Sequence, residues 1–342
     1  MSKIDIRSLD LEQLENEILR LGHSKYRAKQ IYNWISKGVN KFEEMVNLPK
    51  KIQVDLEKEF IIENIVIEKI AESKDNTRKF LLKLIDDNII EAVLMKYKYG
   101  YTICVSTQIG CKMGCKFCAS TIGGKVRDLL PGEILGQILV LQSYIGERIG
   151  HVVLMGSGEP FDNYDNVMKF LELVNDKNGL NISQRSITLS TVGIVPKIYE
   201  LAEKKLQITL AISLHEVDNK KRTALIPSNE KYPIQDIIKA CKFYIKKTKR
   251  RITFEYSLIN GVNDNIETAK LLGVLLKDML CHVNLIPINA VSEKDYKPSS
   301  ERNIVKFKEM LEKQGIATTI RREMGSDINA ACGQLRNDYI KL

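Results

Sequence analysis

The stretch Gln108-Ile-Gly-Cys-Lys-Met-Gly-Cys-Lys-Phe-Cys-Ala119 contains three cysteines, Cys111, Cys115 and Cys118, in the spacing C-x-x-x-C-x-x-C. A structural zinc site uses four ligands, often from paired C-x-x-C knuckles. Three thiolates in one short loop instead suit three irons of a [4Fe–4S] cluster, because such clusters are held by cysteine thiolates. The fourth iron then stays open for another ligand. The spacing therefore predicts an iron–sulfur centre with one open position.

Two other uses of these cysteines are less favoured. A zinc site would need a distant fourth ligand, which His151, His215 or Cys281 could supply. A disulfide framework is disfavoured because the chain begins Met-Ser-Lys-Ile-Asp, without an apolar signal segment or a long transmembrane run. The sequence therefore predicts a cytoplasmic protein with no membrane partner, in a compartment where thiols stay reduced.

The length of 342 residues is sufficient for one large α/β domain and an accessory module. The formal net charge is +9, from 52 Lys and Arg against 43 Asp and Glu. This basic excess is compatible with a polyanionic partner but does not establish one. The most basic stretch, 242–251, is by itself more typical of a solvated helix end than of an RNA contact.

The pattern of apolar residues divides the chain into three parts. The first sixty residues have helical periodicity, and residues 61 to 105 read as short strands joined by turns. We divide the chain into a helical accessory module with a small β extension at 1–97, a barrel at 98–320, and a cysteine loop with the tail at 321–342.

Strands and helices alternate after Tyr101, which predicts an α/β fold with a parallel sheet and right-handed crossovers. About six units favour a partial, open (βα)6 barrel over a closed eight-fold one. The expected strands are 102–106, 152–155, 186–190, 208–213, 252–256 and 283–286, with helices such as 131–145, 163–174 and 234–246.

Polar or glycine-rich segments follow every expected strand, at the rim where the active sites of parallel barrels lie. The cysteine loop follows the first strand, and the resemblance of this loop to the radical-SAM superfamily is direct. In that superfamily S-adenosylmethionine (SAM) binds the open iron, and one electron cleaves it to a 5′-deoxyadenosyl radical. The other segments are Gly156-Ser-Gly-Glu-Pro160, Thr191-Val-Gly193, His215, Asn260-Gly-Val-Asn-Asp264 and Pro287-Ile-Asn289.

The Gly156–Pro160 segment resembles the Gly-Glu-Pro motif of radical-SAM enzymes. Its glycines allow close approach of the backbone to a ligand, although a simple strand-end turn would look similar. Ser190 and Ser213 end adjacent strands and could bond a ribose or a carboxylate. His215 alone is more typical of a satisfied rim histidine than of a base, and Asn289 is equally compatible with a turn.

Cys332 lies in a segment that allows two interpretations. Apolar residues from Ile328 to Tyr339 have helical spacing, so Cys332 could be a buried helix cysteine. Gly325 and Gly333 flank it, however, and favour a loop that reaches the rim. Cys104, just before the cluster loop, points to a second thiol of the site, whereas Cys241 and Cys281 are assigned to structure.

Six segments together resemble the RlmN-type RNA adenine C2 methyltransferases, in order and over essentially the whole chain. These are Gly110-Cys-Lys-Met-Gly-Cys-Lys-Phe-Cys-Ala-Ser-Thr121, Met155-Gly-Ser-Gly-Glu-Pro160, Ser190-Thr-Val-Gly193, Ser213-Leu-His215, Asn284-Leu-Ile-Pro287 and Asp327-Ile-Asn-Ala-Ala-Cys-Gly-Gln-Leu335.

The resemblance implies a role for each site residue. Cys111, Cys115 and Cys118 would hold the [4Fe–4S] cluster. A first SAM would methylate Cys332, and the deoxyadenosyl radical from a second SAM would activate that methyl group for addition to adenine C2. Cys104 would release the tethered RNA by forming a disulfide with Cys332, while Glu91 accepts the C2 proton. The residues implied to bind SAM are Gly158, Glu159, Ser190, Ser213, Leu214, His215 and Asn289.

The resemblance also implies the partners. The substrates would be large-subunit (23S) ribosomal RNA and adenosine 37 of transfer RNA, with the helical module as an RNA clamp. A one-electron reductant such as flavodoxin or ferredoxin would supply electrons to the cluster. The enzyme would act as a monomer. Cfr-like methylation at adenine C8 and modification of a protein by a radical-SAM enzyme are the alternatives.

Overall fold

One ten-stranded sheet runs through most of the protein, whose computed structural model describes residues 3–289, 291 and 294–335. Its antiparallel part is made of β3 (Val66–Glu72), β4 (Arg78–Lys83) and β5 (Ile89–Tyr97). Its parallel part consists of β6 (Gly100–Cys104), β9 (Ile149–Leu154), β10 (Ile187–Thr191), β11 (Thr209–Ser213), β12 (Ile252–Leu258), β13 (Cys281–Pro287) and β14 (Thr318–Ile320).

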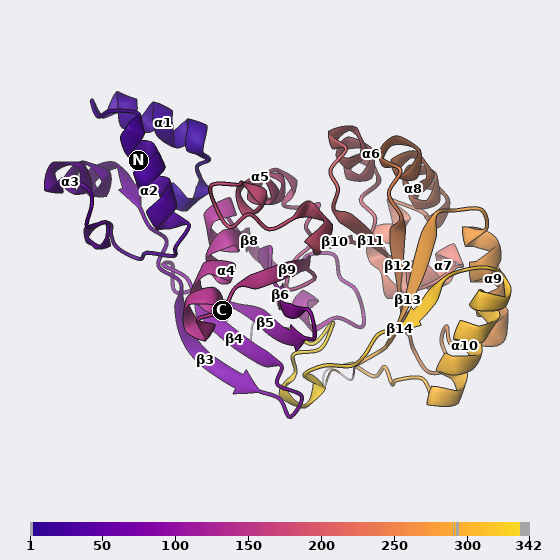
Figure 1. Ribbon diagram of the computed structural model, residues 1–342. Coiled ribbons are helices and arrows are strands. Elements are labelled where there is room, and N and C mark those ends of the chain that lie inside the picture. Colours follow the sequence, from indigo (N-terminus) through magenta and orange to yellow (C-terminus); the bar gives the residue numbers. More distant parts are fainter. Residues whose placement is uncertain (1–2, 290, 292–293, 336–342) are drawn as a thin grey trace.

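Strand β6 joins the two parts of the sheet, because it pairs antiparallel with β5 and parallel with β9 (Figure 1). The strands follow the order β14-β13-β12-β11-β10-β9-β6-β5-β4-β3, and the sheet does not close. The prediction of an α/β fold with an open barrel of parallel strands is confirmed. The β extension is part of the same sheet as the barrel. Strand β14 adds a further parallel strand, which was not predicted because it has only three residues.

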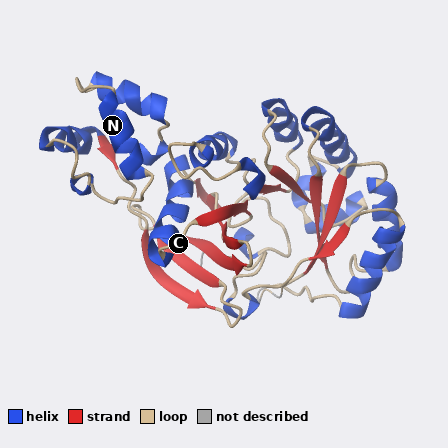
Figure 2. Ribbon diagram, in the orientation of Figure 1, coloured by secondary structure: helices blue, strands red, loops and turns tan. Residues whose placement is uncertain are grey.

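Helices cover the outer face of the parallel strands, as Figures 1 and 2 show. Helix α4 illustrates how the sequence sets their limits: Pro131 lies in its first turn, and Gly146 ends it with a φ of 65°. The helices of the barrel are α4 (Pro131–Ile145), α5 (Tyr164–Asn175), α6 (Val195–Lys204), α7 (Asn219–Leu225), α8 (Ile234–Thr248), α9 (Ile266–Leu276) and α10 (Glu301–Lys313).

The N-terminal module consists of α1 (Leu11–Arg20), α2 (Tyr26–Ile35) and α3 (Lys50–Glu59), closed by the parallel pair β1 (Ile4–Asp5) and β2 (Phe60–Ile61). It has a hydrophobic core of its own. Asp10 and Gln13 cap the start of α1 by bonding each other's backbone N–H groups.

The module is docked on α4 and α5 by polar contacts. The backbone N–H of Gly132 donates to Ser8 Oγ over 3.0 Å, and the Tyr32 hydroxyl donates to Asp176 over 3.1 Å. Lys169 on α5 forms an ion pair with Asp10. These contacts connect the module to the two helices that cover the first strands of the barrel.

The basic stretch 242–251 lies in the last turns of α8 and the turn that leads into β12. It is therefore at the amino end of β12, on the side of the barrel opposite to the rim. The lysines in the last turn of α8 also complement the partial negative charge at the carboxyl end of that helix. Cys241 and Cys281 are buried in the main hydrophobic core. These positions agree with structural roles for the basic stretch, for Cys241 and for Cys281.

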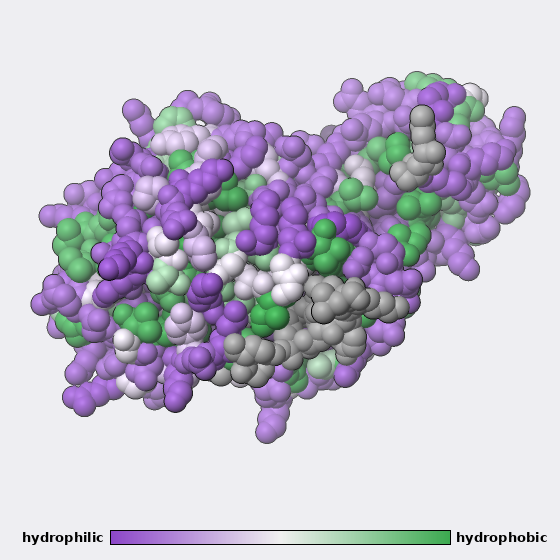
Figure 3. All heavy atoms as spheres, turned by 180° about the vertical axis from the view of Figure 1, so that it is seen from behind, coloured by the Kyte–Doolittle hydropathy of each residue, from purple (hydrophilic) through white to green (hydrophobic). Residues whose placement is uncertain are grey.

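Hydrophilic side chains cover most of the face seen in Figure 3, and hydrophobic ones appear there only in separate patches. Among the described residues, none of the helices combines the length and the apolar character needed to cross a bilayer.

Candidate active site

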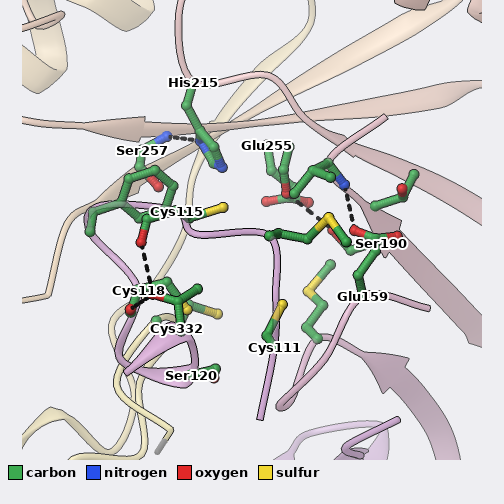
Figure 4. Close-up of a pocket in the computed structure, with 18 of the residues that line it drawn as sticks. Cys111, Cys115, Cys118, Ser120, Glu159, Ser190, His215, Glu255, Ser257 and Cys332 are labelled. Atoms are coloured by element: carbon green, nitrogen blue, oxygen red, sulfur yellow. Dashed lines mark hydrogen bonds between the residues drawn. The ribbon is translucent and has the colours of Figure 1, made fainter. Parts of the chain in front are cut away.

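The carboxyl ends of the parallel strands surround a cavity of about 940 Å³, including the part that opens to solvent (Figure 4). Its walls bring together residues from the cysteine loop, from the ends of β9 to β13 and from the C-terminal loop. The sequence-predicted residues that line it are Cys111, Cys115, Cys118, Gly158, Glu159, Ser190, Ser213, His215 and Cys332.

A short hairpin presents the cysteine loop. Strands β7 (Gln108–Gly110) and β8 (Lys125–Asp128) pair antiparallel, and the Cys111 N–H donates to the Gly124 carbonyl over 2.9 Å. Gly110 has a φ of 72°, and a Cβ there would clash with the same carbonyl. The glycines therefore allow the loop to turn back over the cavity.

The three cysteine thiols of this loop fit an iron–sulfur cluster. Burial raises the pKa of Cys111 to about 12 and also raises the pKa values of Cys115 and Cys118. Burial thus disfavours three neighbouring thiolates unless a cationic group such as the iron of a cluster compensates their charge. Among the residues described, no group of three His, Cys, Asp or Glu could hold a single metal ion.

The zinc alternative finds no support in the positions of its ligands. Cys281 is the first residue of β13, at the end of the strand that lies away from the cavity. His151 is an early residue of β9 and packs against Tyr99. His215 lines the cavity, but its Nδ1 accepts a hydrogen bond from the Ser257 backbone over 2.9 Å.

The Gly156–Pro160 turn places its backbone and one carboxylate at the cavity. Gly158 has a φ of 109°, and a Cβ there would lie 2.7 Å from the Gln108 Cβ. Glu159 accepts hydrogen bonds from the backbone N–H groups of Phe161 (3.0 Å) and Val192 (2.8 Å). Burial nevertheless raises the pKa of Glu159 to about 7. The carboxylate is therefore fixed in position and able to change its charge near neutral pH.

Side chains at the ends of β10 and β11 complete this wall. The hydroxyls of Ser190 and Ser213 lie 3.4 Å apart. Burial, aided by the charge of Arg222, lowers the pKa of His215 to about 3. With Nδ1 accepting a bond, the neutral ring of His215 carries its proton on Nε2, which matches a satisfied rim histidine. The Leu214 side chain is buried in the core, so only its backbone could contact a ligand.

The C-terminal loop carries Cys332 to the cavity as a loop and not within a long helix. After the short 3-10 helix Ser326–Ile328, the Ala119 N–H donates to the Gly333 carbonyl over 2.8 Å, and Asn289 Nδ2 donates to the Cys332 carbonyl over 3.0 Å. Tyr339, part of the helical alternative, lies outside the described residues.

Cys332 lines two cavities, since it also belongs to a second one with Cys104, Asn289 and Arg321. Burial raises the pKa of Cys104 to about 12. Both cysteines are free thiols. The cluster loop and Cys104 thus face Cys332 from different cavities.

Glu91 lines neither of these two cavities. It is buried on β5 and pairs with Lys79 over 3.1 Å, and Lys79 also donates to the Asn329 carbonyl over 3.2 Å. Glu91 is therefore connected to the Cys332 loop through Lys79.

Three charged residues near the cavities were not foreseen from the sequence. Glu255 on β12 lines the first cavity and accepts a bond from Asn284 over 2.9 Å. Its signal was a carboxylate within the otherwise apolar and hydroxylic Ile252-Thr-Phe-Glu-Tyr-Ser-Leu258. Arg222 and Arg321 had no such signal, because each stands beside other cations in the sequence.

Comparison with known families identifies the fold. The model of the Radical SAM superfamily matches residues 105–272, which contain the cysteine loop and strands β9 to β12. The model described as the ribosomal RNA large subunit methyltransferase N-terminal domain matches residues 4–62, which form the helical module. The protein is thus a radical-SAM enzyme with an additional N-terminal domain.

Relatives match nearly the whole chain. A probable dual-specificity RNA methyltransferase RlmN from Clostridium botulinum (strain Alaska E43 / Type E3) is 60% identical over 98% of this chain and 97% of its own length. One from Clostridium perfringens (strain 13 / Type A) is 58% identical over 98% of each chain. A crystal structure of a radical SAM methyltransferase from Sphaerobacter thermophilus has a TM-score of 0.94 at 38% identity, covering 98% of this chain and all of the other. The chain belongs to the RlmN family of radical-SAM methyltransferases.

Proposed function

We propose that this protein methylates C2 of an adenosine in large-subunit ribosomal RNA and C2 of adenosine 37 in transfer RNA. Each turnover would use two SAM molecules. The names of its relatives, dual-specificity RNA methyltransferases, support the substrate class. The observation that carries the proposal is the position of Cys332 between the cavity of the cysteine loop and the cavity of Cys104. An enzyme that only cleaves SAM would need neither thiol.

Cys111, Cys115 and Cys118 would hold the [4Fe–4S] cluster, whose electron, when the cluster is bound, supplies the chemistry that generates a 5′-deoxyadenosyl radical from SAM. Glu159 lies beside these cysteines in the same cavity and would accept a hydrogen bond from the amino group of SAM. The remaining proposed SAM contacts are Gly158, Ser190, Ser213, His215, the backbone of Leu214 and Asn289, whose Oδ1 is buried without a hydrogen-bond partner among the described residues.

Cys332 would carry the methyl carbon to the target base as a covalent intermediate. The adduct, in which a methylene group would join the Cys332 sulfur to C2 of the adenine, would return its unpaired electron to the cluster and must then be released. Cys104, as a thiolate, would attack the Cys332 sulfur, so that a disulfide forms and the carbon–sulfur bond breaks. The electron pair of that bond would stay with the methylene carbon, which takes up a proton from solvent and becomes the methyl group. Glu91 would accept the proton from C2, and its link through Lys79 to the Cys332 loop supports this assignment.

The partners and location follow from the same proposal. The net charge of +9 suits the phosphate backbone of RNA, and we assign RNA binding to the N-terminal module within 1–97. The target base must leave its stack to reach a recessed cavity. A flavodoxin or ferredoxin would donate the electron, and the protein would work as a cytoplasmic monomer.

The test uses anaerobically reconstituted protein, large-subunit ribosomal RNA and SAM with a fully deuterated methyl group, followed by mass spectrometry of the nucleosides. We expect 2-methyladenosine with two deuteriums from the methyl group, because one deuterium is lost when the methyl on Cys332 is activated. Three retained deuteriums would contradict passage through Cys332. 8-Methyladenosine would place the enzyme with the C8 methyltransferases, and SAM cleavage without a labelled nucleoside would favour a protein substrate.

Cysteine variants separate the roles of the thiols. Cys332→Ala should abolish methyl transfer, and Cys104→Ala should leave the protein trapped covalently on RNA. Cys281→Ser is the matched control, because Cys281 lies at the far end of β13. Methyl transfer that survives in Cys332→Ala would refute the mechanism.

A further inference from the structure

Arg222, on α7, is a fully buried cation that none of the proposed steps uses. We propose that its charge is the internal counter-charge of the iron–sulfur cluster and raises the reduction potential of that cluster. The inference rests on the proposed function, because it requires the cluster on Cys111, Cys115 and Cys118.

The guanidinium of Arg222 is held by four uncharged acceptors. Nε donates to the Leu214 carbonyl over 2.9 Å and Nη1 to Asn229 Oδ1 over 2.9 Å. Nη2 donates to the carbonyls of Val192 (2.7 Å) and Ser213 (3.0 Å). These bonds fix the side chain at the ends of β10 and β11, but none of them neutralises its charge.

A buried charge normally has a partner of opposite sign. Within the described part of the chain, Arg222 forms no ion pair with a carboxylate. Burial lowers the pKa of Arg222 to about 10, so it stays cationic at neutral pH, and thiolates at Cys115 and, to a lesser extent, Cys241 would counteract that decrease. Burial raises the pKa of Cys241, which therefore stays a neutral thiol in the core. The anion that would balance the charge of Arg222 is therefore the cluster ligand Cys115.

The packing around Cys115 places Arg222 close to the cluster loop. Leu225, from the same helix as Arg222, belongs to one buried apolar cluster with Cys115 and Ile226. The Lys116 backbone N–H donates to the Leu225 carbonyl over 2.9 Å. The other cations of the loop, Lys112 and Lys116, are exposed to water and their fields are screened.

A fixed cation in this position favours the reduced cluster. One-electron reduction by an external donor adds one negative charge to the cluster, and no proton or bond changes. The attraction to a buried positive charge is therefore stronger after reduction than before it, which raises the potential. Arg222 would act as a positioning and tuning residue and touch neither SAM nor RNA.

The experiment is a potentiometric titration of the reconstituted full-length protein, followed by electron paramagnetic resonance of the reduced cluster, with iron and sulfide content measured for each sample. Two variants cancel the charge in different ways. Arg222→Met removes the guanidinium, whereas Asn229→Asp keeps it and places a carboxylate at the position of Asn229 Oδ1. Arg222→Lys and Asn229→Ala are the controls, since each disturbs the hydrogen bonds but leaves a cation.

In both charge-cancelling variants we expect the ratio of reduced to oxidised cluster at a fixed potential to fall about tenfold, the effect of a unit charge roughly 10 Å away at an effective dielectric constant of about 20. This corresponds to a midpoint about 59 mV more negative for one electron. The controls should stay close to the unaltered protein.

Unchanged midpoints in Arg222→Met and Asn229→Asp would overturn the inference while leaving the methyltransferase proposal intact. Loss of the cluster in these two variants alone would support it, whereas loss in all four variants would assign Arg222 a purely structural role and overturn it. An unaltered protein that takes up no cluster would overturn both proposals.

Discussion

The substitution Glu159→Gln should remove a large part of the pH dependence of stability in the cluster-free protein. Glu159 is buried, and its pKa is raised from the ordinary 4.5 to about 7 because burial disfavours the carboxylate. Each pH unit between the two pKa values is worth about 1.4 kcal/mol, so ionising Glu159 in the folded state costs about 3 kcal/mol.

The sign follows from the direction of the change. A pKa that is higher in the folded than in the unfolded protein means that folding favours the neutral acid. The stabilisation is complete below pH 4.5 and is lost as the pH rises through about 7. The amide introduced by Glu159→Gln has no such titration, although it leaves one of the N–H groups of Phe161 and Val192 without its acceptor.

The assay is urea denaturation of both proteins in reducing buffer from pH 5 to pH 8, with Glu309→Gln on the exposed side of α10 as the control. Because part of the loss already occurs below pH 5, the free energy of unfolding of the unaltered protein should fall by about 2 to 3 kcal/mol more than that of Glu159→Gln over this range. The control should follow the unaltered protein. A difference between the two that stays constant with pH would refute the reasoning.

Two further predictions concern the cofactor turn and RNA. Gly158→Ala should lose about 2 to 5 kcal/mol of stability together with SAM binding, because its Cβ would meet Gln108 at 2.7 Å in a backbone conformation with a φ of 109°. Chemical denaturation and equilibrium dialysis measure both effects, and Gly150→Ala, where a Cβ meets nothing within 4 Å, should lose neither. RNA affinity should fall by roughly tenfold or more between 50 and 200 mM salt, because phosphate contacts release counterions. A filter-binding affinity indifferent to salt would contradict an electrostatic RNA-binding surface.

Much of the fold was predictable because its signals are local. The alternation of apolar strands and amphipathic helices gave helix 131–145 with the limits that α4 has, and the open barrel followed from the number of units. Strand β14 was missed because Thr318–Ile320 is too short to show a period. The continuity of β5 with β6 was missed as well, since a hairpin looks the same whether or not its second strand starts another sheet.

The site was predictable where one residue type dictates the chemistry. The cysteine loop and the Gly156–Pro160 turn carry such signals, and both line the cavity. Leu214 shows the limit of motif-based assignment, because its side chain faces the core. Arg222 shows another limit: within Asn219-Lys-Lys-Arg-Thr it looks like one of several surface cations, and only the packing of α7 reveals that it is buried.

Among the residues that the structure describes, the open sheet leaves two strands, β3 and β14, each with one side that has no neighbour in the sheet. Such edges can recruit a strand from another molecule and so begin aggregation. Here β3 carries Glu68, Lys69 and Glu72, and its register shifts between Ile67 and Lys69, which disturbs the regular row of backbone groups. At the opposite edge β14 offers only three residues. The protein thus combines an incomplete barrel, which leaves space for a large substrate, with edges that resist self-association.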